Sequence, residues 1–205
     1  MAAVDALLID AGTGNLHSVH NALLKLGFNI RVTASPEDLE RPARIILPGV
    51  GAFGSFMQGL RERGLTEPLK AAAGRGDPFF GICVGMQALF DTSEEMGLHP
   101  GLGLLAGRVL RFPNFDSLKV PHTGWNQLWF ADAAPLFRGH PPGSYAYFNH
   151  AYYCAGEDPD DTAASTDYGF DFTSAVQHEN IYGVQFHPEK SQTVGLQVLE
   201  NFFKT

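Results

Sequence analysis

The residue that stands out as a candidate for catalysis is Cys83, in the segment 81–85, Gly-Ile-Cys-Val-Gly. An apolar run over 78–82 predicts a strand before it, and the pattern over 86–90 predicts a helix after it. A strand, a Gly-x-nucleophile-x-Gly turn and a helix make up the nucleophile elbow of hydrolases, here with Cys in place of Ser. At a helix N-terminus the partial positive charge stabilises a thiolate. A buried cysteine in a glycine turn is the alternative, which the flanking strand and helix disfavour.

His187 is the expected base for this nucleophile. It ends the apolar segment 183–186, so its side chain can project over the carboxyl edge of a sheet. Pro188 keeps His187 extended, and alternate residues of an extended chain face the same side. Glu189 can therefore bind one imidazole nitrogen while the other faces Cys83. This is the nucleophile, base and orienter arrangement of catalytic triads, although a His-Pro-Glu segment by itself is usually only a turn.

The remaining candidates for nucleophile or metal chemistry are weaker. Cys154 follows two tyrosines in an apolar strand pattern and is expected to be a core thiol. Five histidines lie in polar or loop contexts and are expected at the surface: His17, His20, His99, His140 and His178. Their spacing forms no set of metal ligands. The sequence therefore predicts no metal site.

Glycines follow the third apolar run, in the segment 48–51, Pro-Gly-Val-Gly. Glycines at this place let backbone amides turn inward, where hydrolases of this architecture place a second oxyanion donor. The predicted oxyanion hole comprises Gly49, Val50, Gly51 and Val84. A phosphate loop is the alternative, but the Gly-Lys-Ser/Thr of a Walker loop is absent. The segment 12–15, Gly-Thr-Gly-Asn, lacks the third glycine of a dinucleotide fingerprint.

The elements that must position these residues alternate between strand and helix in the first half of the chain. Strands are predicted over 4–9, 28–33, 44–47 and 78–82, and helices over 16–26, 53–63, 67–73 and 86–90. This alternation predicts a parallel sheet with helices on both faces. Short aromatic segments later in the chain predict antiparallel strands over 109–112, 126–130, 145–153, 172–177 and 181–186, before a final helix over 193–203. The expected fold is α/β, an open, mostly parallel three-layer sandwich of the flavodoxin-like type, with its ligand site at the carboxyl ends of the strands.

Composition bounds the class of protein. The chain has 205 residues, of which 44% are hydrophobic, so it can bury a core and is not disordered. We expect one domain over 1–205. A net charge of −8 without a basic stripe disfavours nucleic-acid binding. The sequence has no run of 18 apolar residues, so we expect no membrane span. Its N-terminus has no basic region, so we expect no signal peptide. Two cysteines make no disulfide framework, which favours a reduced, cytoplasmic protein.

Taken together, the segments 81–87 and 183–189 resemble the two signatures of the class I, triad-type glutamine amidotransferases. Within that family the chain is similar to the glutaminase subunits of imidazole glycerol phosphate synthases. Three further segments carry this narrower resemblance: 12–18, 48–53 and 121–126. The resemblance runs from Leu8 to the C-terminus. Two positions depart from the pattern, Ala11 where the family often has Tyr and Ala151 where it has Ser or Thr.

The resemblance implies a glutaminase reaction without a cofactor. Cys83 would attack the carboxamide of glutamine and form a thioester, ammonia would leave, and water would release glutamate. His187 would carry the protons and Glu189 would orient it. The implied substrate-binding residues are Gln87, Glu95 and the backbone of Gly51, Ala151 and Tyr152. Glu95 would meet the α-ammonium group, although a carboxylate at a helix end is the alternative.

The resemblance also implies a heterodimer with a (β/α)8-barrel cyclase subunit. That subunit would receive ammonia through a tunnel and make imidazole glycerol phosphate and an aminoimidazole carboxamide ribotide in histidine biosynthesis. The expected contact residues are Trp125, Asn126, Tyr147 and Lys190. Two alternatives stay open: an amidotransferase subunit of another synthase, against which the segment 121–126 argues, and a free-standing cysteine peptidase or γ-glutamyl hydrolase. The intact Cys83, His187 and Glu189 disfavour a binding protein without activity.

Overall fold

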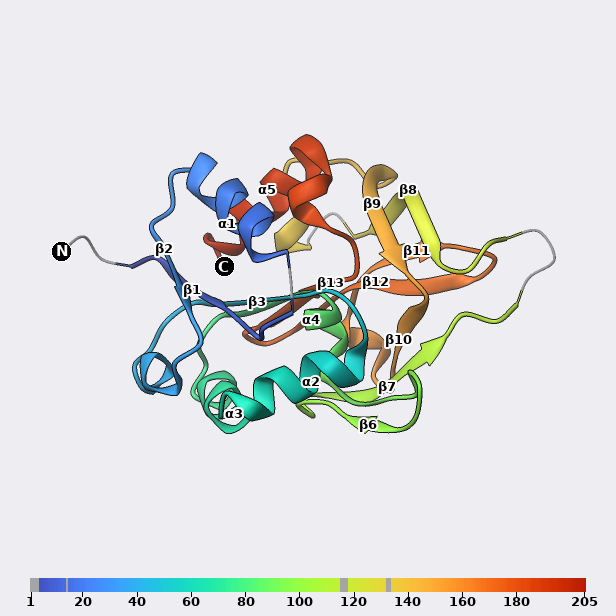
Figure 1. Cartoon of the computed structure of the whole chain (residues 1–205). Coiled ribbons are helices and arrows are strands. Elements are labelled where there is room, and N and C mark those ends of the chain that lie inside the picture. The colour runs from blue at the N-terminus through green and yellow to red at the C-terminus, as the bar shows by residue number, and fades with distance from the viewer. Residues whose placement is uncertain (1–3, 14, 115–117, 132–133) are drawn as a thin grey trace.

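A mixed sheet with helices on both faces organises the chain (Figure 1). The computed structural model describes residues 4–13, 15–114, 118–131 and 134–205, so Gly14 of the predicted glycine loop and residues 1–3 lie outside the described residues. Within them the strands join into one 13-stranded sheet. No helix of the described part is long and apolar enough to cross a membrane.

The first half of the sheet is parallel, as the alternation of strand and helix predicts. Its strands lie in the order β2 (Ile30–Thr33), β1 (Ala6–Ile9), β3 (Ile45–Gly49), β4 (Phe79–Cys83) and β13 (Ile181–Val184). All residues of β1, β3, β4 and β13 are buried. Strands buried on both faces read as continuous apolar runs, which is why the sequence reveals them.

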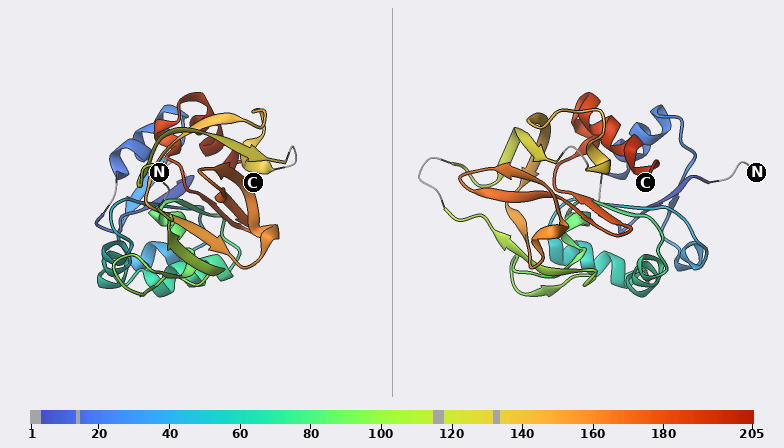
Figure 2. Two further views of the ribbon diagram at one scale, coloured as in Figure 1. Left: turned by 90° about the vertical axis from the view of Figure 1, so that its right-hand side faces the viewer. Right: turned by 180° about the vertical axis from the view of Figure 1, so that it is seen from behind.

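Helices form the two outer layers. α1 (Leu16–Lys25) and α5 (Gln192–Phe202) cover one face, and α2 (Phe53–Glu62) and α3 (Thr66–Gly74) cover the other (Figure 1). Seen from behind, the same two pairs again lie on opposite sides of the sheet (Figure 2). Phe202 of α5 stacks on Phe80 of β4 with ring centroids 5.0 Å apart. The predicted three-layer sandwich is confirmed.

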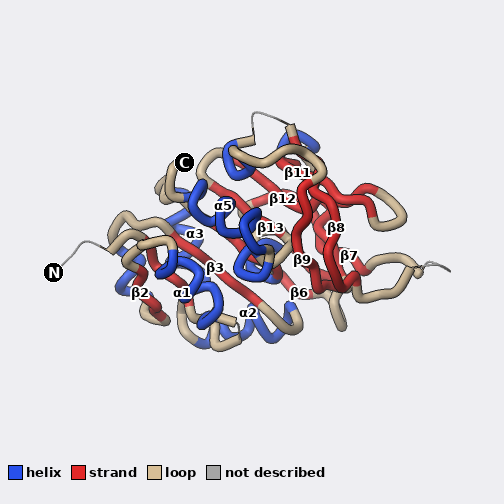
Figure 3. The backbone as a smooth tube through the Cα atoms, turned by 90° about the horizontal axis from the view of Figure 1, so that it is seen from above, coloured by secondary structure: helices blue, strands red, loops and turns tan. Residues whose placement is uncertain are grey.

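Antiparallel strands extend the sheet beyond β13. β12 (Asp171–His178), β10 (Tyr152–Gly156) and β7 (Leu105–Arg111) follow in that order, and β5 (Phe90–Ser93) and β6 (His99–Pro100) form the edge. The pair of β5 with β7 is the exception, because these two strands run parallel. β11 (Thr162–Asp167) joins β12 to β8 (His122–Phe130), which forms an antiparallel pair with β9 (Ser144–His150). This β8–β9 pair lies at the end of the molecule away from β2 (Figure 3).

Four predictions about elements are wrong in detail. The segment 181–186, expected as an antiparallel strand, contains β13, which pairs with β12 in the antiparallel sense but runs parallel to β4. The helix expected over 86–90 is the short α4 (Val84–Gln87), and Phe90 begins β5 instead. The strand expected over 145–153 is two strands, because β9 pairs with β8 and β10 pairs with β7, and Ala151 between them lets the chain change neighbours. Strands β5, β6 and β11 were not expected. β11 consists of small and polar residues that carry no apolar alternation, so it depends on its partners.

Proline sets where the short 3-10 helices begin. Each of η1 (Pro36–Glu40), η2 (Pro135–Phe137), η3 (Pro159–Asp161) and η4 (Pro188–Lys190) has proline as its first residue. Proline suits this position because its φ is already helical and the first amide of a helix has no acceptor within it. The helix η4 turns the chain directly after His187, at the carboxyl end of the parallel strands.

Candidate active site

Cys83 lies on the sharp turn that the glycine pattern predicts. It is the last residue of β4, immediately before α4, with φ +55° and ψ −112°. A positive φ is uncommon for a residue other than glycine and carries strain. A side chain at Gly85 would overlap the carbonyl oxygen of Leu47, and one at Gly81 would lie 2.6 Å from the carbonyl oxygen of Gly85. Glycine is therefore required at both positions for β3, β4 and α4 to approach.

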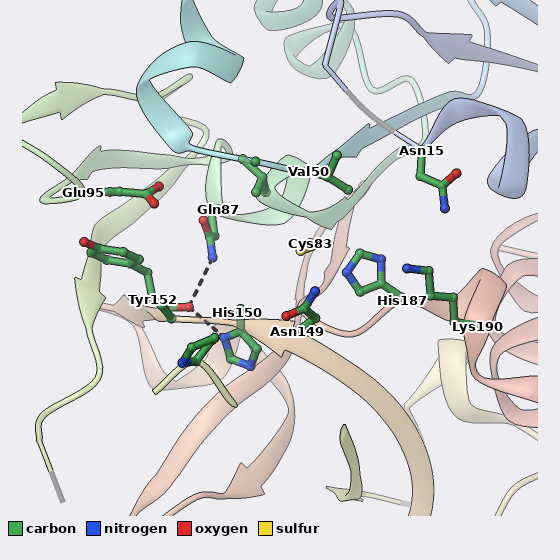
Figure 4. Close-up of a pocket in the computed structure, with 14 residues that line it drawn as sticks. Asn15, Val50, Cys83, Gln87, Glu95, Asn149, His150, Tyr152, His187 and Lys190 are labelled. Carbon is green, nitrogen blue, oxygen red and sulfur yellow. Dashed lines mark hydrogen bonds between the residues drawn. The ribbon is translucent and has the colours of Figure 1, made fainter. Parts of the chain in front are cut away.

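The structure brings the other two predicted triad residues to this turn. The Nδ1 atom of His187 lies 3.0 Å from Oε1 of Glu189, and the two side chains are 5% and 1% exposed. His187 also has Cys83 as a hydrogen-bond partner, and Figure 4 shows the ring beside the sulfur. Since Nδ1 faces the carboxylate, Nε2 is the nitrogen that serves the sulfur.

The charge state of His187 follows from these neighbours. Burial opposes protonation, but the hydrogen bonds and charges of Cys83 and Glu189 outweigh it and raise the pKa of His187 to about 10. The imidazole is therefore held in its protonated form between two acceptors. A protonated imidazole beside a cysteine stabilises the thiolate, which is the nucleophilic form.

A serine that the sequence analysis did not single out holds the backbone of the base. The Ser191 hydroxyl donates to the carbonyl oxygen of His187 over 2.6 Å and accepts from the amide of Tyr147 over 2.9 Å. The amide of His187 in turn donates to the carbonyl oxygen of Tyr147, also over 2.9 Å. We call these three bonds the Ser191 clamp. They join η4 to β9, and a lone buried serine gives no sequence signal for such a role.

A cavity of about 470 Å³ opens beside Cys83 and has the size of a small-ligand site (Figure 4). Its wall includes the predicted residues Val50, Gly51, Cys83, Val84, Gln87, Glu95, Ala151, Tyr152, His187 and Lys190. The wall also contains four residues that were not assigned to the site: Asn15, Pro121, Asn149 and His150. Segments from both halves of the sheet thus meet at this cavity.

The predicted oxyanion loop lies next to the nucleophile. Gly49 ends β3 in register with Cys83 of β4, and a side chain at Gly49 would meet the amide nitrogen of Gly85 at 2.7 Å. Gly51 has φ +86°, a conformation that glycine adopts at little cost. Val50 and Gly51 line the cavity, and Val50 lies on the side opposite Asn149 and Tyr152 (Figure 4).

Two predicted substrate residues are held by defined hydrogen bonds. The buried Gln87 donates through Nε2 to the carbonyl oxygen of Tyr152 over 3.2 Å and to Oε1 of Gln185 over 3.1 Å. Glu95 accepts from the amide of Phe53, the first residue of α2, over 2.7 Å. Glu95 therefore caps a helix and also lines the cavity, so both interpretations of this residue fit the geometry.

Three of the four predicted contact residues form one surface group, in which Trp125 and Lys190 are exposed, Tyr147 is half-buried and Lys190 lines the cavity. Trp125 is 46% exposed and meets the ring of Tyr147 edge-on at 6.1 Å. The Nζ atom of Lys190 lies 5.8 Å from the centroid of the Tyr147 ring. The side chain of Asn126 is instead engaged inside the molecule, because it donates to the carbonyl oxygen of Asp167 over 2.8 Å.

A pair of buried histidines was not predicted. His122 Nδ1 lies 3.0 Å from His150 Nε2 across the β8–β9 pair. Burial lowers the pKa of His122 to about 4 and that of His150 to about 3, so both rings are neutral. Among the histidines expected at the surface, His17 and His178 are exposed and His20, His99 and His140 are partly buried. The described residues contain no group of three acidic, His or Cys side chains placed to hold a metal ion.

Comparison with known proteins decides the family. The family model for class-I glutamine amidotransferases matches residues 7–205. The chain belongs to the class I glutamine amidotransferase family. The resemblance inferred from the sequence is thereby confirmed.

Relatives of this amidotransferase carry a more specific name. The imidazole glycerol phosphate synthase subunit HisH of Desulfitobacterium hafniense is 50% identical over 197 residues, which are 96% of this chain and 92% of that protein. The HisH subunit of Sulfurimonas denitrificans is 48% identical over 200 residues, 96% of each.

Solved structures show the same fold. A glutamine amidotransferase matches with a TM-score of 0.76 at 21% identity, over 97% of each chain. A GMP synthase subunit from Thermoplasma acidophilum matches with a TM-score of 0.72 at 20% identity, over all of this chain and 94% of that one. The α/β fold predicted for this amidotransferase is thus that of its solved neighbours.

Proposed function

We propose that this chain is the glutaminase subunit of an imidazole glycerol phosphate synthase, acting in the cytoplasm as one amidotransferase domain over 1–205. The observation that carries the proposal is the buried arrangement of Cys83, His187 and Glu189 at one wall of the cavity. The HisH relatives, which this chain matches over almost their whole length, support the choice of synthase.

The reaction begins when the Cys83 thiolate attacks the carboxamide carbon of glutamine. The resulting oxyanion is stabilised by backbone amides of Val84 and of the loop Gly49–Gly51. Protonated His187 then donates its Nε2 proton to the leaving nitrogen, the carbon–nitrogen bond breaks, and ammonia departs from a thioester on the sulfur. The neutral imidazole takes a proton from water, the hydroxide attacks the thioester, and glutamate is released with regeneration of the thiolate and the imidazolium.

Glutamine binds in the cavity between Gln87, Glu95 and the backbone of Ala151 and Tyr152. Glu95 attracts the α-ammonium group, since it is an acidic side chain on the cavity wall. The missing hydroxyl at Ala151 matters little in this arrangement, because the backbone makes the contact. The reaction requires neither a cofactor nor a metal.

Ammonia passes to a (β/α)8-barrel cyclase subunit that docks on Trp125, Asn126, Tyr147 and Lys190. Aromatic residues are favoured interface anchors. Trp125 packs on Tyr147, whose ring lies beside Lys190, a residue that lines the cavity from which ammonia leaves. Asn126 is half-buried, and its hydrogen bond to the carbonyl oxygen of Asp167 fixes its side chain in this surface.

The test is glutamate release by the chain alone and after addition of a barrel cyclase with its nucleotide ligand. We expect the isolated chain to be almost inactive and the pair to release glutamate and form imidazole glycerol phosphate. Full activity that the cyclase and its ligand leave unchanged would favour a free-standing hydrolase. Activation by the partner of a different synthase would identify another biosynthetic amidotransferase.

A further inference from the structure

A buried glutamine stands behind the nucleophile and has been given no role. Gln185 is fully buried between β13 and His187, and its Nε2 atom lies 3.8 Å from Sγ of Cys83. Its Oε1 atom accepts from Nε2 of Gln87 over 3.1 Å. One carboxamide thus contacts both the nucleophile and a residue proposed to bind substrate.

The orientation of this carboxamide is set by a backbone carbonyl. The carbonyl oxygen of Tyr152 only accepts hydrogen bonds, so the Gln87 atom 3.2 Å from it is the amide nitrogen. The same nitrogen faces Gln185, which therefore presents its oxygen to Gln87. The amide nitrogen of Gln185 is left on the side of Cys83, where it donates to sulfur. The directions of all three bonds follow from one acceptor.

A second line of hydrogen bonds ends on the same carbonyl and holds it. His150 Nδ1 lies 2.8 Å from the Tyr152 oxygen and must be the protonated nitrogen. Its neutral ring then accepts at Nε2, so His122 Nδ1, 3.0 Å away, is the donor. His122 accepts at Nε2 from Asn126 over 3.3 Å. The neutrality that burial imposes on both rings agrees with this order.

We propose that Gln185 is a positioning residue of the glutaminase site, whose amide N–H stabilises the Cys83 thiolate while its carbonyl oxygen fixes the rotamer of Gln87. The inference rests on the proposed glutaminase function and deepens it. It assigns the sulfur two donors on different sides, the imidazolium of His187 and the neutral amide of Gln185. Gln185 does not line the cavity, so it acts through Cys83 and Gln87.

The other groups near the sulfur do not supply this donor. Cys154 of β10 is buried, and burial followed by the charge of Cys83 raises the pKa of its thiol, so it stays protonated and neutral. His150 is neutral and its Nδ1 proton is used on Tyr152. Among the described residues, His187 and Gln185 are the hydrogen-bond partners of the Cys83 side chain.

The test is the pH dependence of iodoacetamide alkylation of Cys83 in the full chain, followed on the peptide that contains it. Two variants separate the functions of the amide. Q185M removes both hydrogen bonds, whereas Q185E keeps the length and the acceptor for Gln87 but replaces the donor with a carboxylate. The matched control is Q177M on the neighbouring strand β12.

Loss of the donor should raise the alkylation midpoint by about one pH unit in Q185M, which slows alkylation roughly tenfold on its acid side. Q185E should shift it at least as far, because a carboxylate repels the thiolate, with a KM for glutamine closer to the wild-type value than that of Q185M. Q177M should leave the midpoint unchanged. Thermal unfolding shows which variants are folded. If Q185M does not fold, the alkylation midpoint of Q185E decides the test.

An alkylation midpoint in folded Q185M equal to that of the wild type would overturn the proposal, because Q185M removes the donor without adding a charge. Alkylation needs no turnover of glutamine. The role of Gln185 and the proposed glutaminase function can therefore be refuted independently. If the midpoints shift as expected while the wild-type chain with a cyclase releases no glutamate, the proposed function is wrong and the contact with the thiolate stands.

Discussion

The buried histidine pair predicts that acid destabilises the protein well before its carboxylates are protonated. His122 and His150 have pKa values of about 4 and about 3 in the fold because burial penalises the charged ring, against about 6.5 in an unfolded chain. A lowered pKa stabilises the fold fully above pH 6.5, and this stability is lost as the pH falls toward the folded value.

The magnitude follows from linkage. Between pH 7 and pH 5 the unfolded chain binds almost one proton at each histidine and the fold almost none, which costs about 2 kcal/mol per fully buried ring. His122 and His150 are 3% and 6% exposed, so both rings count in full. His187 acts in the opposite sense, because its pKa is raised and its contribution grows by roughly 1 kcal/mol over the same range. The net loss should be about 3 kcal/mol.

Urea unfolding at pH 7, 6 and 5 measures this loss. The variant His122→Phe keeps an aromatic ring against Phe148 and Tyr168, whose centroids lie 4.8 and 3.9 Å away. It should be less stable at pH 7 by about 1–3 kcal/mol, because His150 loses its donor. Its further loss between pH 7 and 5 should be smaller than that of the wild type by about 2 kcal/mol. The exposed His17→Gln serves as control.

Two results would refute this reasoning. One is an equal loss of stability between pH 7 and 5 in the wild type and in His122→Phe. The other is a titration of either ring near pH 6.5 in the folded protein, followed by NMR.

The remaining predictions concern catalysis. Cys83→Ala should abolish glutamate release while the pair with a cyclase still uses free ammonia, and residual glutaminase turnover would contradict the role of the sulfur. His187→Asn should lower kcat about 100-fold or more and further than Glu189→Gln, because the base transfers protons and the orienter only holds it; the reverse order in steady-state kinetics would exchange the two roles. Ser191→Ala should lower kcat more than it raises KM, because it frees the backbone of the base and leaves the cavity wall intact, and a change in KM alone would count against the clamp.

Local patterns were sufficient for four of the five parallel strands and for the turn at Cys83 and the proximity of His187 and Glu189. The strands β1, β3 and β4 are continuous apolar runs, and the turn at Cys83 is marked by its own glycines. His187 and Glu189 are two residues apart, so the chain itself brings them together. Each of these features depends on neighbours in the sequence, which is why a reading of the sequence recovers them.

The features that were missed depend on distant partners. β11 becomes a strand because β12 and β8 pair with it on either side, not because its six small and polar residues favour it. Gln185 contacts Gln87 across 98 positions and Cys83 across 102. His122 meets His150 only because β8 and β9 pair in that register. A single sequence shows these residues but not which of them become neighbours.

The Ser191 clamp ties the backbone of His187, which follows the parallel strand β13, to β9 as well. Cys83 is packed into the parallel sheet, whereas the backbone of His187 is tied at both its amide and its carbonyl to Tyr147 of β9. The distance between the sulfur of Cys83 and the imidazole of His187 therefore depends on how the β8–β9 pair packs against the parallel strands. The exposed Trp125 pairs with Tyr147 across β8 and β9, so a displacement of Trp125 is passed directly to the residue that holds the backbone of His187. The alignment of Cys83 and His187 thus depends on the packing of β9 against the parallel strands and not on either sequence motif alone.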